Sequence, residues 1–269
     1  MALVDTGLLV RYYLDEAASG DPVTIGDASG NNYDLTATGA DVAANMEYVE
    51  VSGNRGVDCS STSGNQRLVH AIDNTSDIIR DADGGSLFTL EVVLIVDAVT
   101  SGGSRIFGIN NRVGGIGDLI LKTTDTVSPF TMTLGYNETD IILTGTDLTA
   151  GTRYVVHVVI NDTANTVKVY VNGTLTSDLI PTLAVLSIDT NSDLIAFNRE
   201  SSGFFGRSFN GTLFYAALYN TNFSADNVTT NYNILTSDDD TPAAGGLTIP
   251  DWIPNTSQPF PFKNEVVGY

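Results

Sequence analysis

Short runs of hydrophobic residues alternate with polar turn residues along most of the chain. Residues 88–97, FTLEVVLIVD, are rich in β-branched side chains and nearly free of charge, a pattern that predicts a buried strand. Residues 153–160, RYVVHVVI, predict a second strand, which leads into a polar turn at residues 161–165. Strands of this kind, separated by turns, predict antiparallel neighbours in a sheet.

A hairpin follows the second of these strands. Val167, Val169 and Val171 lie at alternate positions and therefore point to one face of a strand, with Lys168 on the other face. The next two residues are Asn172-Gly173, the pair that a two-residue hairpin turn favours because both central residues need a positive φ. The pattern predicts a tight hairpin.

Helical periodicity is scarce. Ser224 can cap one short helical turn through SADNVTTNYNIL, but Thr, Asn and Val are indifferent helix formers. We therefore predict an all-β protein in which two antiparallel sheets stack as a β-sandwich to hide their hydrophobic faces. A chain of 269 residues is compatible with one such domain, which we place at residues 1–236.

The composition changes in residues 237–269, which hold five of the eight prolines. Proline cannot serve inside a sheet, so this segment is predicted to be a linker followed by an extended arm. The arm also contains aromatic side chains that a disordered spacer normally lacks. We expect these side chains to dock on a surface of the same chain or of a partner: Trp252, Phe260, Phe262 and Tyr269.

The charge of the chain excludes some partners. Only 12 Lys and Arg face 32 Asp and Glu, which gives a net charge of −20. Nucleic acids and anionic membranes are bound through cationic side chains, so we expect no nucleic-acid binding. We expect no insertion into membranes either, because no apolar run is long enough to span a bilayer.

Cys59 is the only cysteine, so neither an intramolecular disulfide nor a cysteine-based zinc cluster can form. The first residues, MALVDTGLLVRYYLDEA, have no basic region before the apolar ones and are interrupted by charges. They do not resemble a signal peptide, which favours synthesis in a cytoplasm without export through such a signal.

Several of these stretches, in order, resemble the laminin G-like jelly roll of the concanavalin A-like lectin and glucanase superfamily. The resemblance covers about residues 7–235. It includes GLLVRYYLDEAASG as the first strand, DASGNNYDLTATG as an Asp-x-Ser-Gly-Asn loop, FTLEVVLIVD as a central strand, the hairpin that ends in Val-Asn-Gly, and GRSFNGTLFYAALYNTNFSADNV as the last strand with its tail. The resemblance implies a jelly-roll fold.

The chain departs from that family at several positions. Val93 stands where the family often has Trp, and Tyr154-Val155-Val156 replaces a Trp-His-His sequence. Phe214-Tyr215 occupies the place where the family frequently has an acidic pair. If that pair helps to hold a cation in relatives, this chain has lost one of the ligands. His157 lies among apolar residues of a strand, where we expect a structural histidine rather than a ligand.

Residues 27–39, DASGNNYDLTATG, allow two interpretations. Asp27, Asn31 and Asp34 carry the hard oxygen atoms that calcium prefers, and the family resemblance also suggests a calcium site there. Alternatively, Asp27 and Asn31 bond to neighbouring backbone amides in an Asx turn. A loop alone offers too few of the six to eight ligands that calcium takes, so we place the turn first and the metal second.

Carbohydrate binding is the non-enzymatic role that the resemblance implies. Two loops have the Asn, Asp and Gly content typical of sugar-binding loops, GINNRVGGIGD at 108–118 and NRESSGFFGRS at 198–208. Their candidate contacts are Asn110 and Asn111 in the first loop and the aromatic Phe204 and Phe205 in the second. Phenylalanine is also the ordinary core residue of a sandwich.

An enzymatic role has less support. Glucanases of this superfamily resemble one another in a Glu-x-Asp-x-x-Glu strand, which directs carboxylates to one face of a sheet. The chain has no such spacing, since Glu91 stands alone in its strand and Asp97 follows six residues later. We therefore expect no enzymatic activity, although a cryptic polysaccharide hydrolase assembled across strands stays an alternative.

These observations lead to a functional hypothesis. A jelly roll without a signal peptide or disulfide, followed by an aromatic arm, suggests a virion component such as a bacteriophage capsid decoration or fibre protein. The arm would dock on other virion subunits or on copies of the same chain, and the lectin-like domain would face outward toward cell-surface glycans. The alternative is an extracellular or cell-surface carbohydrate-binding module or adhesin.

Overall fold

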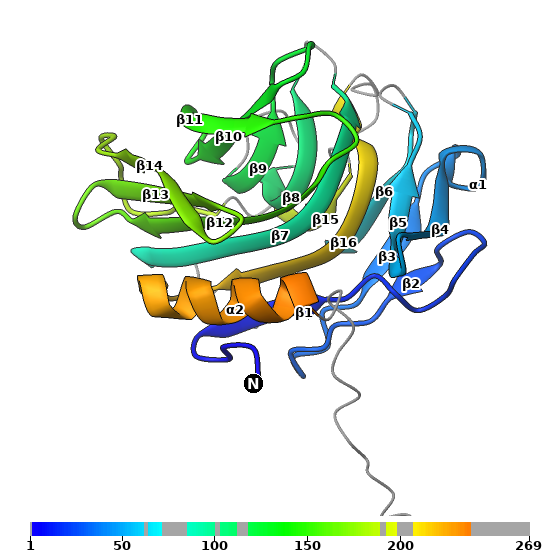
Figure 1. Cartoon of the computed structure of the whole chain (residues 1–269), viewed down its shortest axis with the longest axis horizontal. Coiled ribbons are helices and arrows are strands. Elements are labelled where there is room, and N and C mark those ends of the chain that lie inside the picture. Colours follow the sequence, from blue (N-terminus) through cyan, green and yellow to red (C-terminus); the bar gives the residue numbers. More distant parts are fainter. Residues whose placement is uncertain are drawn as a thin grey trace, which may run out of the picture.

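A computed structural model of the chain describes residues 2–61, 64–71, 85–99, 103–111, 118–188, 192–197 and 207–237. These residues form two antiparallel sheets of eight strands each, which stack as a sandwich (Figure 1). The all-β sandwich predicted from the sequence is thereby confirmed. No helix in the described part of the chain is long and apolar enough to cross a membrane.

Sheet A contains the strand order β14-β13-β12-β7-β16-β5-β4, and β1 pairs with β16 beside this path. Its strands are β1 Leu8–Tyr12, β4 Met46–Val51, β5 Asn54–Cys59, β7 Leu87–Ala98, β12 Arg153–Asn161, β13 Thr166–Val171, β14 Thr174–Leu179 and β16 Asn210–Tyr219. The strands predicted at residues 88–97 and 153–160 are β7 and β12, which lie side by side.

Sheet B contains the strand order β11-β10-β9-β8-β15-β6-β3-β2. Its strands are β2 Thr24–Ile25, β3 Leu35–Thr38, β6 Arg67–Ala71, β8 Ser104–Asn111, β9 Leu119–Thr123, β10 Phe130–Tyr136, β11 Thr139–Leu148 and β15 Ser192–Ala196. Two helices, α1 Val42–Asn45 and α2 Ala225–Ser237, complete the described elements.

The predicted hairpin is β13 and β14, joined at Asn172-Gly173. Both residues have a positive φ, 49° for Asn172 and 73° for Gly173, as the turn requires. The alternation along β13 is also as predicted, because Val167 and Val169 are buried in the core between the sheets. The local sequence therefore determines this turn and the orientation of the strand before it.

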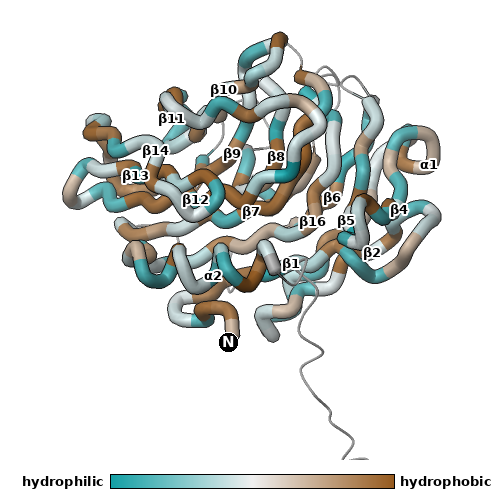
Figure 2. The backbone as a smooth tube through the Cα atoms, in the orientation of Figure 1, coloured by the Kyte–Doolittle hydropathy of each residue, from teal (hydrophilic) through white to brown (hydrophobic). Residues whose placement is uncertain are grey.

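Hydrophobic residues form two separate clusters. The larger cluster, called the main core here, fills the space between the two sheets. The smaller one, the outer core, lies on the opposite face of sheet A and includes Val93 of β7, Val155 of β12 and Phe214 of β16. Figure 2 shows hydrophobic residues recurring along β7 and β12 in the middle of the fold. These strands carry apolar residues on both faces because each face packs on a core.

Helix α2 covers the outer core. It lies across β7 and β16 on the outside of sheet A (Figure 1) and buries Val228 and Leu235 there. Ser224 caps it as predicted, since its Oγ accepts a hydrogen bond of 3.2 Å from the Asn227 N–H. The helix has 13 residues, however, and not the one short turn expected from its weak propensity. Packing on sheet A supplies the stability that the sequence of the helix lacks.

A buried carboxylate lies beneath the helix. Glu91 Oε1 on β7 is 2.7 Å from His157 Nε2 on β12, and both side chains are fully buried. Its Oε2 accepts hydrogen bonds of 3.0 Å from the hydroxyls of Tyr215 and Tyr219 on β16, and one of 3.2 Å from Asn231 Nδ2 of helix α2. The histidine is thus structural, as expected, and Glu91 links two strands and the helix to its own strand.

The N-terminal segment joins the same cluster. Arg11 donates from Nε to the Tyr215 hydroxyl at 3.1 Å and from its Nη2 to the Tyr219 hydroxyl at 3.3 Å. Asn231 Oδ1 accepts a hydrogen bond of 2.8 Å from the Val4 N–H. Because Arg11 can only donate, each tyrosine accepts from Arg11 and donates to Glu91. We call the set formed by Arg11, Glu91, His157, Tyr215, Tyr219 and Asn231 the Glu91 cluster.

This arrangement requires an ionised Glu91. Burial by itself raises the pKa of the carboxyl, but the charge of His157 and the hydrogen bonds of His157, Asn231 and Tyr215 outweigh burial and lower its pKa below the ordinary value. Burial and the neighbouring Glu91 charge raise the pKa of Tyr215 well above its usual range, so its hydroxyl stays protonated and can donate.

We predict that Glu91→Gln lowers the unfolding free energy by about 3 kcal/mol at pH 7, because an amide N–H would meet other donors and His157 would lose its partner. The pKa of Glu91 in the folded protein lies below its ordinary value of about 4.5, so its contribution to stability is complete above that pH and is lost as the pH falls through the lower, native pKa. Urea unfolding between pH 7 and pH 3 should therefore show the gap between wild type and variant narrowing in acid.

Glu50→Gln is the matched control. Glu50 lies on β4, where its side chain is 50% exposed and 3.5 Å from Arg55, and its substitution should change the unfolding free energy by less than about 0.5 kcal/mol. Equal stability of wild type and Glu91→Gln at pH 7, or a gap that widens in acid, would contradict the assigned role of Glu91.

Candidate functional site

Polar residues lie next to one another at one end of sheet B. In the strand register Asn110 of β8 is opposite Asp193 of β15, which in turn is opposite Ala71 of β6. Asp118 directly precedes β9 and Asp34 directly precedes β3, so the same registers place them beside Asn110 and Ala71. We call this line across five neighbouring strands the polar row: Asp118, Asn110, Asp193, Ala71 and Asp34.

The polar row lies on the outer face of sheet B. The neighbouring residues along the strands, such as Leu119, Ile109 and Leu194, belong to the main core, and alternation directs the row to the opposite face. With about 4.8 Å between strands, the row extends over about 19 Å. It therefore forms an extended line of oxygen-bearing side chains, interrupted at Ala71, and not a compact cluster.

Exposure changes along the row. Asn110, Asp118 and Asp193 are at most 2% exposed, whereas Asp34 is exposed to solvent. Asp118 accepts a hydrogen bond from the Ser192 hydroxyl, which anchors the start of β15 to the start of β9. The Asp34 backbone oxygen lies 3.1 Å from Nδ1 of His70, which anchors β3 to β6. The buried part is thus a fixed scaffold, and Asp34 is the part that a ligand can contact directly.

Residues of two sites predicted from the sequence lie at this end of sheet B. Asn110 and Asn111 were proposed for sugar contact, and Asp27, Asn31 and Asp34 for calcium. The structure places Asn110 and Asp34 in the same row, separated by β15 and β6. Asn111 is paired with Ser192 through the backbone at the end of β8.

The loop with Asp27 is an Asx turn that is attached to β1. Asp27 Oδ1 accepts hydrogen bonds from the backbone N–H groups of Ser29 and Arg11, at 2.9 and 3.1 Å. Its Oδ2 accepts from the Ser29 hydroxyl at 2.7 Å and from the Tyr33 N–H at 3.1 Å. These contacts confirm the turn interpretation.

The other predicted calcium ligands also make structural contacts. Asn31 Nδ2 donates a hydrogen bond of 2.8 Å to the Leu9 carbonyl, and Asp34 Oδ1 accepts one of 2.8 Å from the Asp27 N–H. In the described part of the chain, no group of three or more His, Cys, Asp or Glu side chains is placed to hold a metal ion. Calcium binding by Asp27, Asn31 and Asp34 stays a prediction.

The remaining predicted contacts cannot be placed. Phe204 and Phe205 lie outside the described residues, as do the docking residues Trp252, Phe260, Phe262 and Tyr269. Conversely, the structure adds Asp118, Ser192 and Asp193, which the sequence analysis did not select. Asp118 ends a loop that was selected, and Asp193 precedes the apolar run Leu-Ile-Ala-Phe, so a search for polar residues at strand ends could have found both.

Cationic side chains lie farther along the same face of sheet B. Lys122 of β9 is opposite Arg105 of β8 and forms an ion pair with Asp140. Burial lowers the pKa of Lys122, the ion pair with Asp140 offsets part of that effect, and the charges of Arg105 and Arg207 lower it further. Four residues separate Lys122 from Asp118, about 13 Å along a strand. Lys122 and Arg105 thus lie on the same face as the polar row but away from it.

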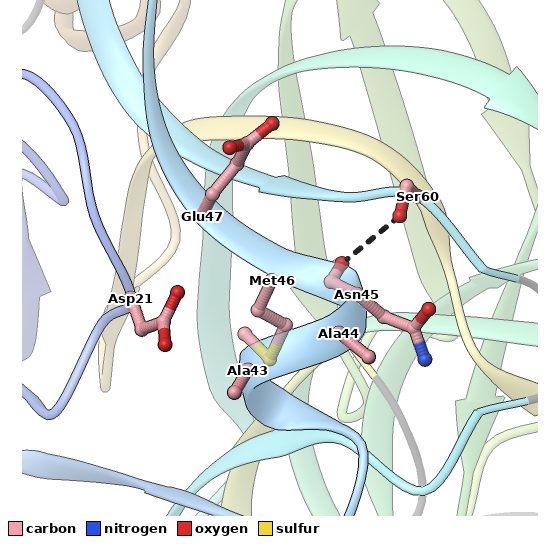
Figure 3. A pocket seen from close by; sticks show the side chains of 7 residues that line it. All are labelled: Asp21, Ala43, Ala44, Asn45, Met46, Glu47 and Ser60. Atoms are coloured by element: carbon pink, nitrogen blue, oxygen red, sulfur yellow. Dashed lines mark hydrogen bonds between the residues drawn. The ribbon is translucent and has the colours of Figure 1, made fainter.

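A small cavity lies elsewhere, beside helix α1 and β4 (Figure 3). Asp21 and Glu47 line it together with Asn45 and Ser60, whose hydroxyl donates a hydrogen bond of 3.4 Å to the Asn45 carbonyl. Its volume is about 120 Å³, well below the roughly 300 to 1,000 Å³ of ordinary ligand pockets. None of the residues selected from the sequence lines it, so we do not assign the functional site there.

The sequence comparison agrees with this architecture. The chain belongs to the Concanavalin A-like lectin/glucanases superfamily, whose profile matches residues 73–229. The suspected relationship is therefore confirmed. A comparison with curated protein sequences finds no significant match.

Solved structures share the fold at low sequence identity. Domain 4 of AbnA, an extracellular GH43 arabinanase from Geobacillus stearothermophilus solved with arabinotriose, superimposes with a TM-score of 0.59 at 12% identity, over 84% of this chain and 98% of that domain. A Trypanosoma rangeli sialidase in complex with 2,3-difluorosialic acid gives a TM-score of 0.57 at 17% identity over 86% of this chain.

A structure of botulinum neurotoxin type C, whose cell entry depends on two ganglioside molecules, gives a TM-score of 0.56 at 12% identity over 86% of this chain. The match covers 51% of the neurotoxin chain and 33% of the sialidase chain, so this protein spans only part of each. At such identities the likeness shows the fold alone.

We predict that Asp27→Ala lowers the unfolding free energy by about 2 kcal/mol, because backbone N–H groups of Arg11, Ser29 and Tyr33 lose their acceptor. Thermal unfolding of the wild-type protein should give the same midpoint with calcium and with a chelator, since hydrogen bonds already occupy both carboxylate oxygens of Asp27.

Asp21→Ala, a change of an exposed carboxylate at a nearby position, is the control and should alter stability by less than about 0.5 kcal/mol. A rise of the midpoint with calcium that disappears in Asp27→Ala would instead support the metal site.

Proposed function

We propose that this protein is a non-enzymatic carbohydrate-binding protein whose ligand binds at the polar-row end of sheet B. The observation that carries the proposal is the polar row itself, which aligns Asp118, Asn110, Asp193 and the exposed Asp34. Sugar hydroxyls both donate and accept hydrogen bonds, and carboxylate and amide groups fixed on strands are suited to orient them.

The position of the row supports a binding site. Strands β6 and β8 end at the row and β9 and β15 begin there, so four strand ends lie at one end of a rigid sheet. Binding residues are often carried by loops on such a scaffold. Superfamily membership and the arabinotriose bound by the arabinanase domain are consistent with a sugar ligand.

The surroundings of Glu91 support the absence of catalysis. A glycosidase needs two carboxyl groups that flank a bound sugar about 5 to 9.5 Å apart. Glu91, the acidic residue in the middle of strand β7, is fully buried and paired with His157, whereas Asp97 lies near the end of the same strand. Glu91 also points away from sheet B, where we place the ligand.

We predict that the protein binds defined oligosaccharides on a glycan array, and that Asp34→Ala at the exposed end of the polar row and Asn111→Ala next to Asn110 each weaken binding at least about tenfold. A lost hydrogen bond at a sugar site has roughly this effect. Asn54→Ala at the turn between β4 and β5 is the control and should bind as wild type does.

Thermal unfolding would establish that each variant is folded. The absence of binding to any glycan, or binding that neither variant alters, would contradict the proposed site. Turnover of any member of a polysaccharide panel would contradict the non-enzymatic role.

A second proposal concerns the setting in which the domain works. Residues 237–269 combine five prolines with Trp252, Phe260, Phe262 and Tyr269, a composition suited to extended docking. The segment follows helix α2, whose Leu235 carbonyl accepts a hydrogen bond of 3.0 Å from Arg153. We propose that the protein is a virion component, a capsid decoration or fibre protein made in the host cytoplasm, with an extracellular adhesin as the alternative.

We predict that the full chain assembles with itself or with other virion subunits, and that a chain ending at Ser237 stays monomeric, because the docking aromatics are then absent. Light scattering measures the oligomeric mass of each. Trp252→Ala should weaken assembly, whereas Asn255→Ala in the same segment should not. A mass-spectrometric inventory of purified particles that lacks the chain would contradict the virion role.

A further inference from the structure

Helix α2 and the first residues of the chain form a layer on the outside of sheet A (Figure 1). The outer core beneath this layer shares no residue with the main core between the sheets. The helix buries Val228 and Leu235 in the outer core, and Leu3 and Val4 pack against it. We call helix α2 together with residues 2–7 the outer layer. Because its core is separate, the outer layer can leave sheet A without opening the sandwich.

The two parts of the outer layer are bonded to each other as well as to sheet A. Asn231 Oδ1 of helix α2 accepts a hydrogen bond of 2.8 Å from the Val4 N–H, and its Nδ2 donates one of 3.2 Å to Glu91 Oε2. Arg11 Nη2 donates to the Val4 carbonyl at 2.9 Å. One asparagine thus joins the helix both to the N-terminal segment and to the buried carboxylate, so we expect the two parts to detach together.

Glu91 faces the outer layer from sheet A. In the described part of the chain, the titratable and charged groups that contact it or its tyrosines come from three strands: His157, Tyr215, Tyr219 and Arg11. Helix α2 contributes the uncharged Asn231. Farther out, Asp5 forms an ion pair of 2.7 Å with Arg11, and the Tyr13 ring lies 5.6 Å from that of Tyr215. Glu91 is fully buried whereas Asp5 is 70% exposed, so acid alters the buried contacts through Glu91.

Protonation of Glu91 removes the charge that these donors compensate. Burial raises the pKa of Glu91, but the charge of His157 and the hydrogen bonds from His157, Asn231 and Tyr215 outweigh burial and lower it. When the layer opens, water replaces these donors and the carboxyl regains a higher, ordinary pKa. The closed layer is therefore favoured above that ordinary pKa, and this contribution is lost as the pH falls through the lower, native pKa.

We propose that the outer layer is an acid-releasable cover: protonation of Glu91 detaches helix α2 and residues 2–7 together from sheet A while the sandwich stays folded. Release exposes the hydrophobic outer face of sheet A, including Val93, Val155 and Phe214. It also detaches the helix from which residues 237–269 continue. The proposal goes beyond carbohydrate binding and does not depend on it.

The test measures hydrogen exchange of the full chain by mass spectrometry between pH 7 and pH 3, corrected for the intrinsic pH dependence of exchange. Peptides from helix α2 and from residues 2–7 should be protected at pH 7 and lose protection together in acid. We expect this loss to be at least about tenfold larger than that of peptides from β9 and β10 in sheet B. A hydrophobic dye should bind over the same pH range, because the outer core becomes exposed.

Two variants separate the charge from the helix contact. Glu91→Gln removes the charge, so helix α2 should exchange faster than in wild type at pH 7 and change less in acid. Asn231→Ala leaves sheet A unaltered and should cost helix α2 and residues 2–7 their protection already at pH 7, which provides a test even if Glu91→Gln does not fold. Thr229→Ala is the matched control on the same helix. It removes a hydrogen bond of 2.9 Å to the Ala225 carbonyl at an exposed position and should behave as wild type does.

Three results would overturn the proposal. Loss of protection in sheet B together with helix α2 would show that the whole sandwich opens at once. An acid response of helix α2 that is the same in Glu91→Gln as in wild type would remove Glu91 as the trigger. Protection of residues 2–7 that persists after helix α2 has opened would exclude release of the two parts as one layer.

Discussion

The buried carboxylate of Glu91 is the interaction on which the outer layer of the protein depends. It is held by a histidine of β12, two tyrosines of β16 and an asparagine of helix α2, and the tyrosines are held in turn by Arg11 of β1. A charge without water must be compensated by nearby donors, and here the donors come from separate parts of the chain. Any arrangement that lacks one of these parts leaves a buried charge under-compensated.

This constraint explains why the protein has two hydrophobic cores. The sheets stack on the main core, as in any β-sandwich, but sheet A also carries apolar residues on its outer face. Helix α2 and the N-terminal segment cover that face, and the Glu91 cluster determines how they sit because its hydrogen bonds are directional. Burial of apolar side chains supplies most of the stabilising free energy, and the Glu91 cluster aligns helix α2 and the N-terminal segment on sheet A.

The same arrangement distinguishes the outer faces of the two sheets. Helix α2 covers the outside of sheet A (Figure 1), whereas the polar row lies on the outer face of sheet B. The row is itself largely buried, because Asn110, Asp118 and Asp193 are at most 2% exposed and Asp34 is the exposed member.

The sequence by itself determined the local features of the fold. Alternation identified β7, β12 and β13, and Asn172-Gly173 identified the turn, because strand orientation and positive φ depend on adjacent residues. The family resemblance in turn identified the sandwich. Within the candidate site, the sequence indicated Asn110 and the Asx turn at Asp27. Asn, Asp and Gly favour turns through contacts between adjacent residues, so the local sequence reveals them.

Only the tertiary structure decided which distant residues meet. Helix α2 is three times longer than one short turn would be because sheet A stabilises it, and Glu91 has partners from three other elements that no local pattern reveals. Likewise Asp34, Asp193 and Asn110 become neighbours only through the order of β3, β6, β15 and β8. That order is set by packing between sheets, and strand pairing over long sequence distances leaves no periodic trace in the chain.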